Sequence, residues 1–132
     1  MMLHTKRELR VKILQFCSLA YTLGITVLLL FPATIAPKID VPSFDKIGHL
    51  VVFAVLVILW GLFISAKKAS TDFNIYKVLL GAFIYGIVIE ALQGLFIASR
   101  TADGWDLLAN TVGILLGWII FRQIKKVFVL KS

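Results

Sequence analysis

Ionisable and amide side chains interrupt the long apolar stretches of this 132-residue chain. The stretch 78–98 contains Glu90 and Gln93, and the stretch 47–66 contains His49 close to its start. Insertion scales assign a charged side chain at the centre of a bilayer a cost of about 2.5–3.5 kcal/mol, so such a residue is a functional candidate by default. A carboxylate, an amide and an imidazole can bind a polar ligand, and the carboxylate and the imidazole can also transfer protons.

Helical spacing places these side chains on shared faces. Asp45 and His49 are four residues apart, a spacing that brings two side chains together on one face of a helix. Asp106 and Asn110 have the same spacing. Glycines continue the faces of Glu90 and Asn110, and because small residues let helix backbones approach closely in lipid, we expect these glycines to pack against neighbouring helices. They are Gly86, Gly94, Gly113 and Gly117.

Four apolar runs must position these residues. The chain is 60% hydrophobic and 16% charged, with a mean hydropathy of +0.96, whereas an ordinary soluble domain has about 25% charged residues. This composition excludes a soluble enzyme, a disordered chain and a coiled coil. Each run approaches the roughly 20 residues that cross a bilayer, and none has the alternation of a barrel strand. We therefore predict an all-α polytopic membrane protein, a single domain over 1–132 with four transmembrane helices in a small bundle at about 13–31, 46–66, 77–98 and 105–122.

The distribution of basic residues predicts how the helices are oriented. The chain has 14 Lys and Arg against 7 Asp and Glu, a formal charge of +7. Eleven of the 14 fall in the N-terminal arm, the second loop and the C-terminal tail, whereas Lys38, Lys46 and Arg100 fall on the opposite side. The positive-inside rule then places both termini in the cytoplasm. In this orientation the polar residues gather at the outer ends of the second, third and fourth helices.

We expect these outer polar residues to form a shallow, outward-facing pocket that binds a ligand. A rise of about 1.5 Å per residue puts Glu90 roughly 12 Å below the outer end of its helix. Glu90 is therefore expected at the bottom of the pocket, with charged residues at the mouth. The predicted ligand-binding residues are Asp45, Lys46, His49, Glu90, Gln93, Arg100, Asp103, Asp106 and Asn110.

Each of these residues also has a structural interpretation, which the sequence leaves open. Asp45 and Asp103 suit helix N-caps, and Asp106 suits the dipole of a first helical turn. Lys46 and Arg100 are long enough to extend to the outer headgroups. The other side chains can bridge helices by hydrogen bonds worth about 0.6–2 kcal/mol in lipid.

The sequence predicts neither a metal site nor a cofactor. A single histidine, His49, lies at the outer end without a cysteine beside it, so no familiar ligand spacing is present. The one cysteine, Cys17, excludes an internal disulfide, and its apolar surroundings predict a buried, inert thiol. We also find no nucleophile–base pair, no phosphate-binding glycine loop and no nucleic-acid module, so nucleic acid is not an expected partner.

Three motifs follow one another over about residues 45–117. They are Asp45-Lys46-Ile47-Gly48-His49, then Glu90-x-x-Gln93, then Arg100-x-x-Asp103-x-x-Asp106-x-x-x-Asn110-x-x-Gly113-x-x-x-Gly117. This series resembles the VanZ-like family of small bacterial membrane proteins. The resemblance implies a multi-pass protein of the bacterial cytoplasmic membrane. The family is named after an accessory protein of glycopeptide-antibiotic resistance that is associated with teicoplanin tolerance.

Three hypotheses about function follow. The leading one is a non-catalytic protein of the cell envelope whose outer polar pocket binds a lipid-linked precursor, a phospholipid headgroup or a glycopeptide. The second is an intramembrane enzyme that acts on a lipid-linked substrate, with Glu90 or His49 as the acid–base residue. The third is an assembly partner that docks through its glycine faces. Membrane lipids are the expected surroundings in each case, and a small bundle of this kind is also a candidate for self-association.

Overall fold

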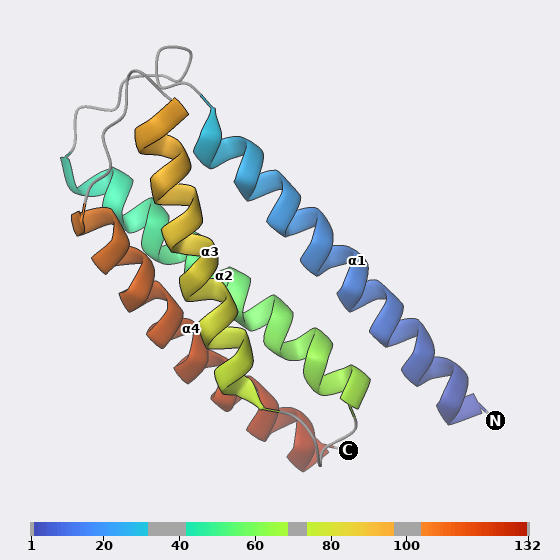
Figure 1. Ribbon diagram of the computed structural model, residues 1–132. Coiled ribbons are helices and arrows are strands. Elements are labelled where there is room, and N and C mark those ends of the chain that lie inside the picture. The colour runs from blue at the N-terminus through green and yellow to red at the C-terminus, as the bar shows by residue number, and fades with distance from the viewer. Residues whose placement is uncertain (1, 32–41, 69–73, 97–103, 132) are drawn as a thin grey trace.

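The structure is a computed structural model that describes residues 2–31, 42–68, 74–96 and 104–131. Within these residues the chain folds into four α-helices and no strand (Figure 1). The helices are α1 (Met2–Leu30), α2 (Pro42–Lys68), α3 (Ile75–Phe96) and α4 (Gly104–Lys131). All four are long and apolar enough to cross a membrane. The prediction of an all-α protein with four membrane-spanning helices is confirmed.

Three helices are longer than the apolar runs that predict them, α1 and α4 most clearly. Helix α1 begins at Met2 rather than near residue 13, and α4 continues to Lys131 rather than ending near residue 122. A hydropathy pattern marks the part of a helix that lies in lipid. The helix itself continues wherever the backbone can form its own hydrogen bonds, and Lys and Arg are good helix formers.

Local sequence explains where two of the helices begin. Pro42 is the first residue of α2, a position where proline loses no intrahelical hydrogen bond. Asn74 precedes α3, and its side-chain oxygen accepts a hydrogen bond from the backbone N–H of Tyr76 at 3.0 Å. Asn74 therefore caps the N-terminus of α3.

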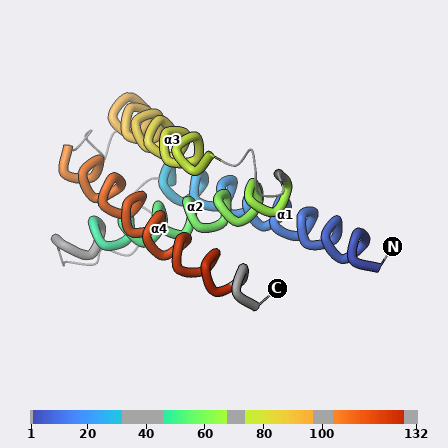
Figure 2. Tube along the Cα trace, turned by 90° about the horizontal axis from the view of Figure 1, so that it is seen from below, coloured from blue at the N-terminus to red at the C-terminus, as the bar shows by residue number. Residues whose placement is uncertain are grey.

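Helix α2 is at the centre of the bundle. It contacts each of the other three helices, and its contact with α4 is the largest in the protein. Seen from below, α2 lies between α1 and α4, and α3 lies on one side of them (Figure 2). Both chain termini lie at the same end of the bundle (Figure 1). We call the opposite end, where α1 and α3 end and α2 and α4 begin, the distal end.

Glycines bring the backbones of α2 and α4 into direct contact. A Cβ atom added to Gly117 would lie 2.6 Å from the carbonyl oxygen of Ala54, and one added to Gly113 would overlap the carbonyl oxygen of Leu50. These two contacts are separated by one helical turn on each helix, and we call them the glycine seam. In lipid, such close approach gains van der Waals contact that larger residues would prevent.

Much of the outer surface of the bundle is apolar. Large hydrophobic side chains such as Phe16, Leu23 and Phe96 are more than two-thirds exposed, as expected for helices that contact lipid rather than water. Cys17 is also on this surface. The prediction that its thiol is buried is wrong, because an apolar residue of a membrane helix can face acyl chains as easily as protein.

Candidate functional site

Four polar side chains from three helices meet near the distal end. They are His49 on α2, Glu90 on α3, and Asp106 and Asn110 on α4, and we call them the distal cluster. Each is at most 9% exposed. Only Asp106 and Asn110 share a helix, so the meeting of α2, α3 and α4 at this point is a property of the helix packing.

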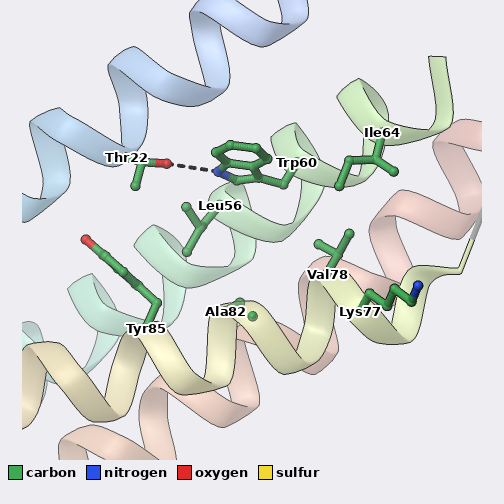
Figure 3. Close-up of a pocket in the computed structure, with 9 residues that line it drawn as sticks. Thr22, Leu56, Trp60, Ile64, Lys77, Val78, Ala82 and Tyr85 are labelled. Carbon is green, nitrogen blue, oxygen red and sulfur yellow. Dashed lines mark hydrogen bonds between the residues drawn. The ribbon is translucent and has the colours of Figure 1, made fainter. Parts of the chain in front are cut away.

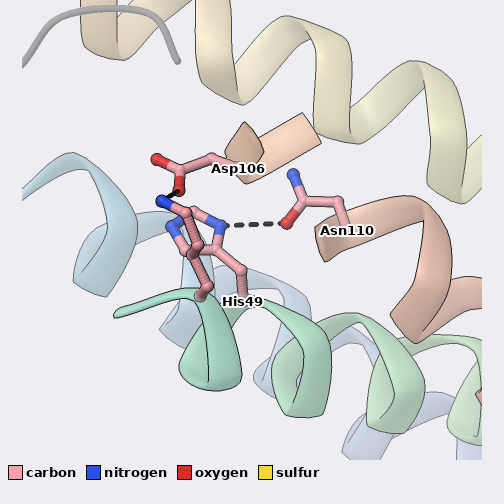
Figure 4. A network of polar contacts seen from close by, with 4 residues as sticks. His49, Asp106 and Asn110 are labelled. Atoms are coloured by element: carbon pink, nitrogen blue, oxygen red, sulfur yellow. Dashed lines mark hydrogen bonds and ion pairs between the residues drawn. The ribbon is translucent and has the colours of Figure 1, made fainter. Parts of the chain in front are cut away.

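A hydrogen bond connects His49 to Asn110. The Nδ1 atom of His49 lies 2.9 Å from the side-chain oxygen of Asn110 (Figure 4). An amide oxygen can only accept, so the imidazole donates from Nδ1. The neutral ring then has its lone pair on Nε2. Asn110 thereby sets both the orientation and the tautomer of His49.

The glycine seam explains why these two side chains meet. His49 directly precedes Leu50, whose carbonyl oxygen contacts Gly113. Asn110 lies three residues before Gly113, on the same face of α4. Because the backbones are in contact at this point, the two short side chains span the remaining distance without displacing either helix.

Asp106 and Lys46 form the rim of the distal cluster. The ammonium of Lys46 lies 3.5 Å from Oδ1 of Asp106. Measured for the side chains alone, without the backbone, the exposed fractions are 40% for Lys46 and 13% for Asp106. Asp106 is in the first turn of α4, where the helix dipole favours a negative charge. This ion pair is the most accessible part of the cluster.

Glu90 reaches the cluster from a buried stripe of α3. Ala82, Gly86 and Glu90 follow one another at intervals of four and are all buried. A Cβ atom added to Gly86 would lie 3.2 Å from Phe53 and 3.4 Å from the amide nitrogen of Asn110. The prediction that Gly86 packs against neighbouring helices is therefore consistent with the packing of α3 on α2 and α4.

The predicted depth of Glu90 needs correction. Ligand atoms of His49, Glu90 and Asp106 all lie within 4.8 Å of one another. The carboxylate therefore lies closer to the other polar groups than the count along α3 predicts. Depth counted along one helix cannot include the crossing of the helices or the reach of a long side chain.

Gln93 is buried and has a partner on α1, and its predicted ligand-binding role stays a prediction. Its amide nitrogen donates a 2.7 Å hydrogen bond to the carbonyl oxygen of Leu29, in the last turn of α1. The last carbonyl groups of a helix have no partner within that helix. Gln93 therefore ties the end of α1 to α3, which is a structural role.

Several predicted residues lie outside this description. Arg100 and Asp103 are outside the described residues, and the side chain of Asp45 is not described although its backbone belongs to α2. Gly94 is exposed in the last turn of α3. Its predicted packing against a neighbouring helix stays a prediction.

The family model described as VanZ/LLP1 matches residues 4–128. The chain belongs to this family. The match is wider than residues 45–117, over which the sequence motifs resemble VanZ-like proteins, and it includes α1. No curated protein and no solved structure gives a significant match.

The structure of this VanZ-family protein brings together side chains that could bind a metal ion, although their spacing in the sequence does not indicate it. The sequence predicts no metal site because His49 has no second histidine or cysteine nearby. In space, however, an imidazole and two carboxylates from three different helices converge. Local motifs reveal ligands that share a helix or a loop, so this arrangement could not be recognised from spacing.

A second feature of the VanZ-family protein is an apolar groove on the other side of α2. The groove has a volume of about 270 Å³ (Figure 3). Apolar residues dominate its lining. The polar lining residues are Lys77, Thr22 and Tyr85. The others are Leu56, Trp60, Ile64, Val78, Gly81 and Ala82.

Hydrogen bonds fix the polar side chains in and beside this groove. The indole nitrogen of Trp60 donates to the hydroxyl of Thr22 at 2.9 Å. The hydroxyl groups of Thr26 and Tyr85 lie 2.6 Å apart. These residues are not among the predicted functional residues, because hydroxyl and aromatic side chains are common in membrane helices. The spacing of Thr22 and Thr26, four residues apart on α1, is the one signal that they share a face.

Proposed function

We propose that this multi-pass membrane protein binds a polar headgroup of the bacterial cell envelope at its distal end. One observation carries the proposal: polar side chains from three helices are buried together near one end of the bundle, where apolar residues would cost less. Two of the four are ionisable acids. A bundle that needed only to pack would not require them.

The rim determines which ligands suit the site. Lys46 and Asp106 are its accessible groups, and they offer one positive and one negative charge. Arg100 and Asp103 are near Asp106 in the sequence and would add a further charge of each sign. Such a rim suits a headgroup with both anionic and amide or amine groups, as in lipid-linked wall precursors and glycopeptides.

The proposed location is the cytoplasmic membrane of a bacterium, with both termini in the cytoplasm and the distal end outside. The distribution of Lys and Arg supports this orientation. A distal end on the outer side would meet both externally added glycopeptides and wall precursors that have crossed the membrane. Family membership supports a link to glycopeptide tolerance as part of the proposal.

The test is teicoplanin susceptibility in a sensitive bacterial host. We expect the wild-type chain to raise the inhibitory concentration, and Glu90→Gln and Asp106→Asn to lose at least half of that increase at matched membrane levels. The matched control is Glu8→Gln, because Glu8 is an exposed acid on α1, far along the chain from the distal cluster. Arg100→Ala tests the predicted rim.

Two outcomes would contradict the proposal. If the wild-type chain gave no protection, the link to glycopeptide tolerance would be wrong. If it protected and the cluster variants protected equally well, the distal cluster would not be the binding site.

A second candidate function is supported by the orientation of His49. An imidazole whose Nδ1 is held by Asn110 presents Nε2 as a base, an arrangement that suits general acid–base catalysis beside Glu90. Turnover of a labelled lipid-linked precursor by purified protein would favour this enzyme. Binding of the precursor without conversion would favour the headgroup-binding protein.

The third hypothesis, docking of a partner through the glycine faces, loses its main support. Gly113 and Gly117 already contact α2 of the same chain. The surface that remains for self-association is the lipid-facing one.

A further inference from the structure

We propose that His49, Glu90 and Asp106 bind a divalent first-row metal ion, for which Zn²⁺ is the best probe. Their ligand atoms lie within 4.8 Å of one another and come from α2, α3 and α4. Three protein ligands with a remaining open position is the usual composition of a zinc site that also binds a small ligand.

The distances are compatible with this assignment. Zn²⁺ binds imidazole nitrogen and carboxylate oxygen at about 2.0–2.2 Å, which in a tetrahedral site places the ligand atoms about 3.3–3.6 Å apart. Closing the present arrangement requires movements of about 1 Å or slightly more, which side-chain rotation can supply. The imidazole makes the site more suitable for a first-row metal than for Mg²⁺ or Ca²⁺, which prefer oxygen alone.

Asn110 provides the supporting contact that metal-binding histidines commonly have. A histidine that binds a metal through one nitrogen usually donates from the other, and that hydrogen bond fixes the ring. Nδ1 of His49 donates to Asn110 at 2.9 Å, so Nε2 is the nitrogen with a lone pair for the metal. The amide nitrogen of Asn110 is buried, and no described residue accepts a hydrogen bond from it. It faces α3 near Gly86.

The charges of the three side chains are also compatible with a divalent ion. Two carboxylates within a membrane protein are costly unless positive charge compensates them. Lys46 supplies one positive charge at 3.5 Å from Asp106. A divalent ion bound by a neutral imidazole and two carboxylates would compensate both acids, and Lys46 could then extend towards the headgroups. Lys46 and the metal therefore compete for Asp106.

The experiment measures the metal bound to the whole purified chain. The chain is purified with an affinity tag that contains no histidine. The protein is stripped with EDTA, equilibrated with Zn²⁺, passed through a desalting column and assayed by mass spectrometry of the metal. We expect one Zn²⁺ per chain for the wild type, and at least a tenfold weaker affinity for Glu90→Gln and for Asp106→Asn. Lys46→Gln should bind Zn²⁺ more tightly than the wild type, since it removes the competing charge.

The chain offers a matched control in a second histidine–carboxylate pair. His4 and Glu8 lie on the exposed face of α1 with Nδ1 and Oε1 3.1 Å apart. The double variant His4→Ala, Glu8→Ala should keep the full zinc content. Circular dichroism and gel filtration select the variants that fold, and Asp106→Asn at the rim is the less disruptive of the two cluster substitutions.

Three results would overturn the assignment. They are a wild-type zinc content no higher than that of a protein-free blank, a loss of zinc with the His4 and Glu8 pair, or unchanged affinity in a folded Glu90→Gln or Asp106→Asn protein. Because this experiment contains no antibiotic and no envelope lipid, its failure is distinct from failure of headgroup binding.

Discussion

The two sides of α2 are packed in different ways. On the side of α4, glycines bring backbone against backbone, and the polar side chains of the distal cluster are held at this seam. On the side of α1 and α3, side-chain hydrogen bonds reach across a groove of about 270 Å³. The first interface has backbone contact at two successive turns, whereas the second has hydrogen bonds between side chains.

This difference indicates at which interface the distances between side chains must be fixed closely. Chemistry between an imidazole and carboxylates depends on distances of a fraction of an ångström, so it belongs at the interface that cannot slide. The groove holds no cluster of ionisable side chains among its lining residues, so its geometry is less constrained. We therefore expect substitutions at the seam to cost more than substitutions at the groove.

The largest effect is expected for Gly113→Leu. A leucine side chain would overlap the backbone of α2 at Leu50, and backbone cannot move aside as a flexible side chain can. Overpacking usually costs about 1–3 kcal/mol, and we expect this variant to lose about 3 kcal/mol or more of its free energy of unfolding. Titration with SDS in mixed micelles measures it. The control is Gly24→Leu, since a Cβ atom on Gly24 meets nothing within 4 Å.

A smaller effect is expected for Asn110→Leu. The substitution removes the acceptor of the His49 N–H group at a buried position, which costs about 1–3 kcal/mol. The neighbouring Thr111→Val is the control, because the Thr111 hydroxyl bonds within its own helix, to the carbonyl of Leu107. Equal stability of the two variants in the same SDS titration would show that the hydrogen bond between α2 and α4 contributes nothing.

The smallest effect is expected for Trp60→Phe at the groove. This change keeps an aromatic ring and removes the hydrogen bond to Thr22. Hydrogen bonds between membrane helices average about 0.6 kcal/mol, so the free energy of unfolding should fall by about that amount. Trp105→Phe, at a residue that is 66% exposed, serves as the reference. A loss larger than that of Asn110→Leu would reverse the proposed ranking of the two interfaces.

The sequence alone was sufficient to predict the four helices, because a helix that crosses lipid must have a certain length and an apolar composition. It was also sufficient to select His49, Glu90, Asp106 and Asn110 as candidates, since polar groups in apolar helices are costly. Their role as ligand-binding residues stays a prediction. The glycines at 113 and 117 were recognisable because their spacing matches the helical repeat.

The sequence could not predict which side chains or backbone groups each polar residue contacts. Gln93 lies one turn from Glu90, and its amide nitrogen donates to the end of α1, a partner that helical spacing does not indicate. The convergence of His49, Glu90 and Asp106 likewise depends on how three helices cross. Helical periodicity defines a face, but packing determines what that face meets.

The central claim is that the α2–α4 seam holds His49 against Asn110 within the membrane. The most direct test is solid-state NMR of the protein in lipid bilayers with isotopically labelled histidine and asparagine, which is practical because the chain has 2 histidines. We predict a proton on Nδ1 of His49 and a dipolar coupling between that nitrogen and the side-chain amide carbon of Asn110. A His49 ring protonated on Nε2 alone, with no coupling to Asn110, would contradict the account.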